Sequence, residues 1–192
     1  MKRIMLREYA EIERALGSRE EVIVFEEFIR GVPIGSSLDI GTAIGTYAKC
    51  CHKKGFEAYG IDISQEAVRF CERKRNGPTF ICGSFPEDAP ARKFSLITAM
   101  TGTPNHFDLE NFVGDVRRFL DERGYVVLSF WRKIGGQDFL RLYSNEDKKN
   151  IARTLVVDEE ADRLVSQNFE VVDSRVNTFN KLKTYLLRGK NE

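Results

Sequence analysis

The amino-acid sequence predicts one α/β domain: a doubly wound, mostly parallel sheet of seven strands, with N-terminal helices and a C-terminal antiparallel hairpin. Three observations carry this prediction. Short apolar runs alternate with helical patterns through the middle of the chain, as they do in βαβ units. Two strand patterns separated by only a few residues close the chain. The length of 192 residues suits a single domain.

The N-terminal region precedes this alternation. Residues 4–30 have the spacing of one or two amphipathic helices, with a break at Gly17 and Ser18 and an end near Gly31 and Pro33. We expect this region to pack over the sheet. The predicted division of the chain is a helical cap (1–33), a core (34–131), an insertion (132–157) and a C-terminal helix with the hairpin (158–192).

The first three strands and the two helices between them follow from apolar runs and their stop signals. Gly55 ends the first helix, because glycine is common just after a helix C-terminus. Ser64 is the expected N-cap of the second helix, which Asn76, Gly77 and Pro78 stop. The strands are predicted at 37–40, 57–61 and 79–82, and the helices at 45–54 and 64–74.

The second half of the chain continues the pattern. A strand over 94–99 precedes a helix over 107–120, and Gly124 separates that helix from a strand over 125–130. The polar stretch 132–157 is expected to be an insertion next to the functional site. A helix over 158–167, acidic in its first turn, then leads to the hairpin strands 169–176 and 182–188.

Charge and cysteine content bear on the class of protein. Thirty Lys and Arg against 29 Asp and Glu give a net charge of +1, so neither nucleic acid nor an anionic membrane is an expected partner. The basic run 73–75 complements the dipole of a helix end. The four cysteines lack C-x-x-C spacing, which predicts reduced thiols and no metal site. Without an apolar secretion signal or membrane span, the expected location is the cytoplasm.

The strongest local motif is LDIGTAIGT, residues 38–46. An apolar strand delivers Asp39 and Gly41 to a tight turn, and Gly45 opens the following helix. Glycine allows a ligand to approach the backbone, and a turn at a helix start presents amide groups to polar ligands. In the simpler interpretation, Asp39 only caps the neighbouring helix.

Asp62 ends the second strand, 62 − 41 = 21 residues after Gly41, where an acid meets ribose hydroxyls in doubly wound folds. Taken alone, Asp62 is also a plain helix-start acid before Ser64. Together with Asp39, it is expected to flank one ligand crevice at the carboxyl ends of the strands. A dinucleotide-binding loop prefers G-x-G-x-x-G, whereas this turn has Ala43 between its glycines and an acid before it.

Four motifs, in order, resemble those of the class I S-adenosylmethionine-dependent methyltransferases. They are LDIGTAIG, YGIDIS, FICGSF and FSLITAMTGTPNHF, and the resemblance covers residues 36–188. It implies a Rossmann-like fold, S-adenosylmethionine as the cofactor of the core, and methyl transfer as the activity.

The resemblance also implies cofactor contacts. The turn from Gly41 to Gly45, with Thr42 and Ala43, would pass beneath the methionine part, and Asp39 would help to hold its amino group directly or through water. Asp62 would bind the ribose. The remaining implied contacts are Ile63 on the adenine, Gly83, Ser84 and the backbone near Phe85 at the adenine edge, and Met100 close to the cofactor.

Two positions depart from the family pattern. The adenine edge often meets an acid, but here the residue is Ser84, whose hydroxyl can still hydrogen-bond. The middle glycine of the turn is Ala43. Its methyl group fits a turn with an ordinary backbone and is strained where the position needs a positive φ.

The acceptor side of the site is expected in the fourth motif. A hydroxyl or protonated amine acceptor needs a base, and His106 is the candidate. Asn105, directly before it, is the second candidate catalytic residue. Alternatively, His106 caps the helix near Asp108, or Asn105 and His106 only hydrogen-bond the loop. Tyr9 and Trp131 are either aromatic walls of an acceptor site or packing residues.

The expected function is therefore transfer of a methyl group from S-adenosylmethionine to a small-molecule nitrogen or oxygen acceptor. The sequence Thr103-Pro104-Asn105 differs from the loop of enzymes that methylate exocyclic base amines, which argues against nucleobases. The alternative is a noncatalytic S-adenosylmethionine-binding sensor or subunit with the same fold. A nucleotide-linked oxidoreductase ranks below both.

Overall fold

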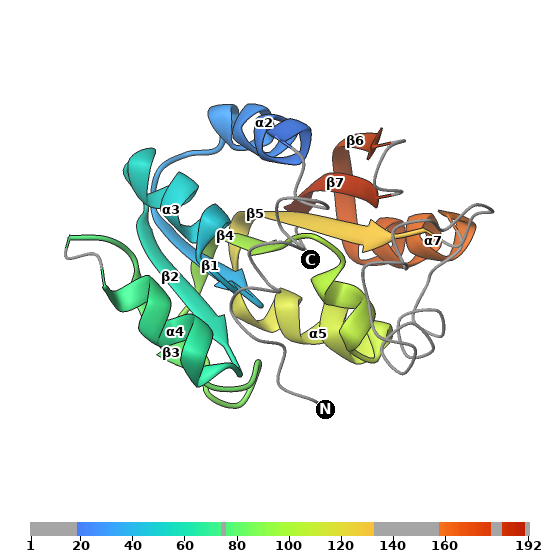
Figure 1. Cartoon of the computed structure of the whole chain (residues 1–192). Helices are drawn as coiled ribbons and strands as arrows, with labels where there is room; N and C mark the ends of the chain where they lie inside the picture. Colours follow the sequence, from blue (N-terminus) through green and yellow to red (C-terminus); the bar gives the residue numbers. More distant parts are fainter. Residues whose placement is uncertain (1–18, 74–75, 133–157, 178–181, 191–192) are drawn as a thin grey trace.

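The computed structural model describes residues 19–73, 76–132, 158–177 and 182–190, and Figure 1 shows helices layered on a twisted sheet. Seven strands form this sheet in the order β3-β2-β1-β4-β5-β7-β6. β1 pairs in parallel with β2 and β4, whereas β7 runs antiparallel between β5 and β6. The predicted fold class is confirmed. The strands are β1 Ser36–Ile40, β2 Glu57–Asp62, β3 Thr79–Cys82, β4 Phe94–Ala99, β5 Leu120–Trp131, β6 Phe169–Asn177 and β7 Leu182–Gly189.

The helices begin and end close to the predicted positions. Ser64 Oγ accepts a hydrogen bond from Ala67 N at 3.3 Å, and Asp108 Oδ1 accepts one from Asn111 N at 3.0 Å. Asp108 is therefore the cap of α5, and the interpretation of His106 as that cap is wrong. The helices are α2 Arg19–Phe28, α3 Thr46–Lys53, α4 Gln65–Glu72, α5 Leu109–Phe119 and α7 Asp158–Asn168, with 3₁₀ turns η1 Ile29–Gly31 and η2 Thr103–His106.

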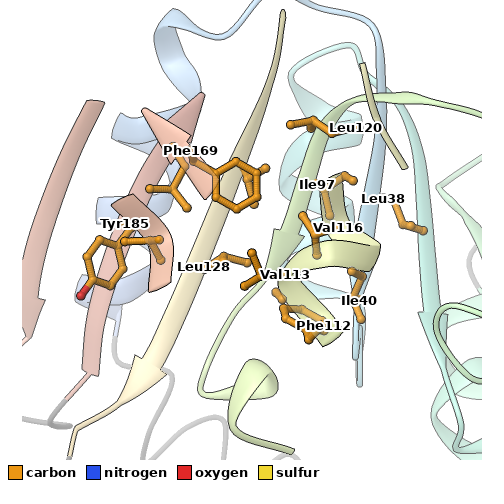
Figure 2. Close-up of a cluster of buried hydrophobic side chains, with 14 of the residues drawn as sticks. Leu38, Ile40, Ile97, Phe112, Val113, Val116, Leu120, Leu128, Phe169 and Tyr185 are labelled. Atoms are coloured by element: carbon orange, nitrogen blue, oxygen red, sulfur yellow. The ribbon is translucent and has the colours of Figure 1, made fainter. Parts of the chain in front are cut away.

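Two apolar clusters hold the layers together, one on each face of the sheet. α2 and α3 cover one face, where Phe25 and Phe28 pack with Tyr47. α5 and α7 cover the other, and Figure 2 shows Phe112 and Val116 of α5 facing the central strands. The side chains of β1 are buried on both faces, so its apolar run is that of a central parallel strand.

β5 is longer than the sequence predicts. The strand begins at Leu120, and its pairing with β4 shifts register between Phe94 and Leu96. Gly124 lies within the strand and does not precede it. The Leu120 side chain packs against this position, where a Cβ would lie 2.7 Å from Leu120 Cδ1. The glycine marks a bulge, which periodicity alone reads as a boundary.

An ion pair joins the end of β5 to the start of α7. Arg132 Nε donates to Asp158 Oδ1 at 2.7 Å, and the second guanidinium nitrogen contacts the other carboxylate oxygen. These hydrogen bonds hold the pKa of the Asp158 carboxyl below its ordinary value. Residues 133–157 of the predicted insertion lie outside the described residues, as do Tyr9 and the part of the predicted N-terminal helices that precedes Arg19.

Among the helices that the structure describes, none combines the length and apolar character needed to span a membrane.

Candidate functional site

The turn that follows β1 is built from left-handed backbone conformations. Gly41, Ala43 and Gly45 have φ angles of 67°, 47° and 78°. The Gly41 and Thr42 amides both donate to Ile61 O, at 2.9 and 3.1 Å, and the Gly45 amide donates to Thr42 O at 2.7 Å. The turn is thus fastened to β2, and these amides act within the protein rather than as the open anion cradle that the motif suggested.

Ala43 occupies a left-handed conformation, which is unfavourable for a residue with a Cβ. A non-glycine residue in the left-handed region costs about 1–2 kcal/mol, and its φ is 47°. Its neighbours hold it in place, because the Ala43 amide donates to Asp62 Oδ2 at 2.8 Å and Cys71 Sγ contacts Ala43 O at 3.4 Å. The strain is stored where the turn meets the ends of β1 and β2, and strain of this kind clusters at functional sites.

Asp62 joins the first two motifs. Its Oδ2 accepts from the Ala43 amide at 2.8 Å, and its Oδ1 accepts from the Ser64 amide at 2.8 Å. Each carboxylate oxygen can accept a second hydrogen bond, so the group keeps acceptor capacity for a ligand. The predicted meeting of the turn with this acid is therefore present in the fold.

Asp39 lies beneath the turn and points into the protein. Its two oxygens accept hydrogen bonds from Thr42 Oγ1 and Thr98 Oγ1, each at 2.7 Å, and only 2% of the residue is exposed. Burial raises the pKa of Asp39 to about 6, although the two hydroxyls oppose this change. Direct contact with a ligand amino group stays a prediction, and the enclosure of Asp39 favours an indirect influence through Thr42 and through charge.

The end of β2 carries an exposed apolar side chain. Ile63 is 59% exposed although it follows the nearly buried Asp62. An apolar side chain next to a polar acceptor suits a ligand that has a flat ring joined to a polar group. The adenine contact that the family resemblance implies falls at this position.

The connection after β3 brings an acid, Asp88, to the position where the family often has one and this chain has Ser84. The Ser84 amide donates to Asp88 Oδ2 at 2.8 Å, and a Cβ on Gly83 would lie 2.4 Å from Asp88 Cβ. Asp88 therefore folds back over the motif. Sequence reasoning missed Asp88, although the sequence shows an acid four residues after Ser84. The Phe85 ring packs on Phe119, with centroids 5.4 Å apart, which leaves its backbone for the predicted ligand contact.

The fourth motif packs directly on the first. The chain leaves β4 through the buried Met100 and reverses at Thr101 and Gly102, whose φ angles are 53° and 74°. This reversal brings Thr103 against Gly41, where an added Cβ would lie 2.7 Å from Thr103 Cγ2. Gly41 is thus required both for its backbone conformation and for its close contact with the loop 101–106.

Asn105 has a structural partner. Its Oδ1 accepts from Trp131 N at 2.9 Å, and its Nδ2 donates to Trp131 O at 3.3 Å. The Trp131 ring is buried against Gly102, where a Cβ would meet it at 2.6 Å. Of the two interpretations of Trp131, packing is the one that fits, and Asn105 acts as an anchor of the loop.

His106 stands at the end of η2, beside this anchor. Its ring meets the Trp131 ring edge on, with centroids 5.9 Å apart. The residue is otherwise exposed. Desolvation by the surrounding protein lowers the pKa of His106 below its ordinary value. Its imidazole is therefore mainly neutral at neutral pH and can accept a proton.

Sequence reasoning also missed Glu21, a buried acid of α2. It shares a helix face with Phe25 and Phe28, at spacings of four and seven residues, so an acid on an apolar stripe was the available signal. Its Oε1 contacts the loop after β4. Across the described ranges, no cluster of three or more His, Cys, Asp or Glu side chains has an arrangement that would hold a metal ion.

Comparison with known proteins gives a consistent result. A family model described as a methyltransferase domain matches residues 6–170. Magnesium protoporphyrin IX methyltransferase from Synechocystis, solved with SAH (S-adenosylhomocysteine) bound, superposes with a TM-score of 0.74 at 15% identity, over 96% of this chain and 93% of that one. A sequence comparison with curated proteins finds no match.

Two further solved structures share the fold. The plantazolicin methyltransferase BpumL in complex with SAH has a TM-score of 0.71 at 12% identity, over 96% of this chain and 90% of that one. An S-adenosylmethionine-dependent methyltransferase from Clostridium acetobutylicum has a TM-score of 0.72 at 15% identity, over 96% of this chain and 99% of that one.

Proposed function

This chain belongs to the methyltransferase domain family, and on that premise we propose that it transfers the methyl group of S-adenosylmethionine to a small-molecule nitrogen or oxygen acceptor. One observation carries the proposal: Asp62 Oδ2 accepts from the Ala43 amide at 2.8 Å, at the carboxyl ends of β1 and β2. Ligands of open α/β sheets bind at this edge. The turn and the acid therefore offer one binding site for both ends of an adenosyl ligand.

The residues around Asp62 fit the adenosyl part of the cofactor. The remaining acceptor capacity of the carboxylate suits the two hydroxyls of a ribose, and the exposed Ile63 side chain offers an apolar surface to the adenine. Ser84 and Asp88 offer a hydroxyl and a carboxylate beside it. Asp39 adds a negative charge beneath the turn, which favours a cationic ligand.

When bound, S-adenosylmethionine supplies an electrophilic methyl group on a positively charged sulfur. The protein then has to align an acceptor with that methyl group, and alignment alone provides a large part of the acceleration. The loop 101–106 forms the acceptor side, because Thr103 contacts Gly41 of the turn. His106, held beside Trp131 with a lowered pKa, takes the proton that a hydroxyl or ammonium acceptor must lose.

The acceptor class is inferred from charge and from the structural neighbours. A net charge of +1 offers little attraction to a polyanion. The neighbours include a magnesium protoporphyrin IX methyltransferase and a plantazolicin methyltransferase, and neither name refers to a nucleic acid. These observations favour a small organic acceptor.

A noncatalytic binding protein is the second candidate. The anchoring role of Asn105 favours it, because the Trp131 backbone holds a side chain that would otherwise act on a substrate. Such a protein binds S-adenosylmethionine without consuming it. The two candidates differ in whether a methyl group is transferred.

The decisive experiment incubates the purified protein with labelled S-adenosylmethionine and separate metabolite, protein and RNA fractions. We expect label in the metabolite fraction together with formation of SAH. Tight binding without label in any fraction would favour the noncatalytic candidate.

A matched pair of variants tests the binding site by calorimetry with SAH. Asp62→Asn is expected to weaken binding at least about tenfold, because it removes charge and acceptor capacity. Glu66→Gln, the same chemical change in the first turn of α4, is expected to bind as wild type does. Equal affinity in both variants would contradict the assignment of Asp62.

A further inference from the structure

Glu21 is an acidic side chain inside the layer between α2 and the sheet. Only 2% of the residue is exposed, and Phe25 and Phe28 on the same helix face are buried with it. Burying a carboxylate in such surroundings is unfavourable unless hydrogen bonds compensate for it. The partners of this carboxylate therefore indicate what the residue does.

One carboxylate oxygen of Glu21 bridges strand β5 and the loop after β4. Glu21 Oε1 accepts from Ser129 Oγ at 3.0 Å and from the Thr101 amide at 3.3 Å. Ser129 lies near the carboxyl end of β5, and Thr101 follows the carboxyl end of β4. The N-terminal helix thereby contacts the edge of the sheet at which the proposed reaction takes place.

Thr101 has a conformation that needs such support. Its φ of 53° is unusual for a β-branched residue and persists only where the surroundings enforce it. Besides the Glu21 contact, its hydroxyl contacts Tyr47 Oη at 3.3 Å, and the Gly102 amide donates to Ser129 O at 3.1 Å. Helices α2 and α3 and strand β5 thus all hold the reversal at Thr101.

The direction of the chain after this reversal sets the acceptor side of the site. Thr103 rests on Gly41, and Asn105 pairs with the Trp131 backbone. His106 follows directly and packs its ring on Trp131. A change in the Thr101 backbone would therefore displace the proposed base relative to the turn.

We propose that Glu21 is a positioning residue for the loop 101–106: its carboxylate fixes the left-handed Thr101 backbone to β5 and so holds His106 in register with the turn after β1. The proposal deepens the proposed function, since its value for catalysis depends on that function. The positioning itself is independent of any ligand. Asp62 fastens the turn separately, so loss of Glu21 should act on the loop while SAH still binds.

The chain contains one tryptophan, Trp131, which lies against this loop and reports its position by fluorescence. Glu21→Ala is expected to shift Trp131 emission to the red and to raise its acrylamide quenching constant about twofold or more, because the loop loosens. Glu21→Gln keeps an acceptor oxygen and is expected to stay close to wild type. Glu20→Ala, an exposed acid of the same helix, is the control and should not change the quenching.

The outcomes separate the alternatives. Wild-type quenching in a folded Glu21→Ala variant would overturn the proposal. If Glu21 only stabilised the fold, its removal would lower the Tm and leave Trp131 shielded. If Glu21→Ala does not fold, Ser129→Ala decides: it removes one hydrogen-bond donor to the carboxylate, and unchanged quenching there would also overturn the proposal.

A second readout connects the positioning to chemistry. The rate of SAH formation is measured with the metabolite fraction that the wild-type protein methylates. Glu21→Ala should keep its SAH affinity but form SAH about tenfold more slowly than wild type, because small misplacements near the reacting atoms are costly. A wild-type rate in this variant would overturn the role in catalysis. Failure of the wild-type protein to form SAH would refute the proposed function, whereas the fluorescence result would still decide the positioning role.

Discussion

Replacing Asp39 by asparagine removes an unfavourable ionisation from the proposed site. The carboxyl is enclosed by Thr42 and Thr98, and its pKa is raised from 3.8 to about 6 by burial. Asparagine keeps the size of the side chain and an acceptor oxygen, and both threonine hydroxyls can also accept from its amide. The substitution therefore changes the charge with little change in packing.

The magnitude follows from the pKa difference. Because the folded-state pKa lies above the unfolded value, the carboxyl stabilises the fold fully only below pH 3.8, and this contribution is lost as the pH rises through about 6. The complete difference corresponds to about 3 kcal/mol, of which about 1.4 kcal/mol falls between pH 5 and pH 8. The asparagine side chain of the variant does not titrate, so the variant lacks this loss.

Urea unfolding of wild type and Asp39→Asn, from pH 5 to pH 8, measures the effect. The free energy of unfolding of the variant, relative to wild type, should rise by about 1.4 kcal/mol across this range and level off above pH 7. Asp121→Asn, the same change at an exposed position, is the control and should show no such trend. A pH-independent difference for Asp39→Asn would refute the reasoning that burial of an ionised carboxylate strains this site.

Three further predictions test the turn and the base. Ala43→Gly should raise the free energy of unfolding, measured with urea, by about 0.5–1 kcal/mol, because glycine accepts a φ of 47° without strain. The greater freedom of glycine in the unfolded chain offsets part of the gain. A loss of stability would show that the turn is not strained. Gly41→Ala should lower the free energy of unfolding by about 2 kcal/mol or more, because the new Cβ would lie 2.7 Å from Thr103 Cγ2. It should also weaken SAH binding in calorimetry. Wild-type values for both quantities would contradict the described contact. If His106 is the base, its lowered pKa means that the methylation rate should fall with acidification only below the ordinary histidine pKa. His106→Ala should reduce the rate above pH 7 about 100-fold. An unchanged rate in the variant would remove His106 as the base.

The acceptor side shows where short motifs mislead. Asn105 and His106 are adjacent in sequence and were both assigned to catalysis, yet η2 turns Asn105 inward to the Trp131 backbone and leaves His106 at the solvent-facing end. Adjacent residues in a tight turn point in different directions, and their roles depend on the strand that the turn packs against. Only Trp131, 25 residues after His106, distinguishes them.

The sequence by itself determined the sheet, its helices and the positions of the site motifs, because hydrophobic periodicity, caps and glycines act over a few neighbouring residues. It predicted that the turn after β1 and Asp62 share one edge, since carboxyl ends of parallel strands coincide. The tertiary structure alone decided where each carboxylate points: Asp39 inward to two threonines, and Glu21 across to Thr101 and Ser129. Except for the bond from Thr42 to Asp39, these hydrogen bonds join residues 59 to 108 positions apart, so no local pattern encodes them.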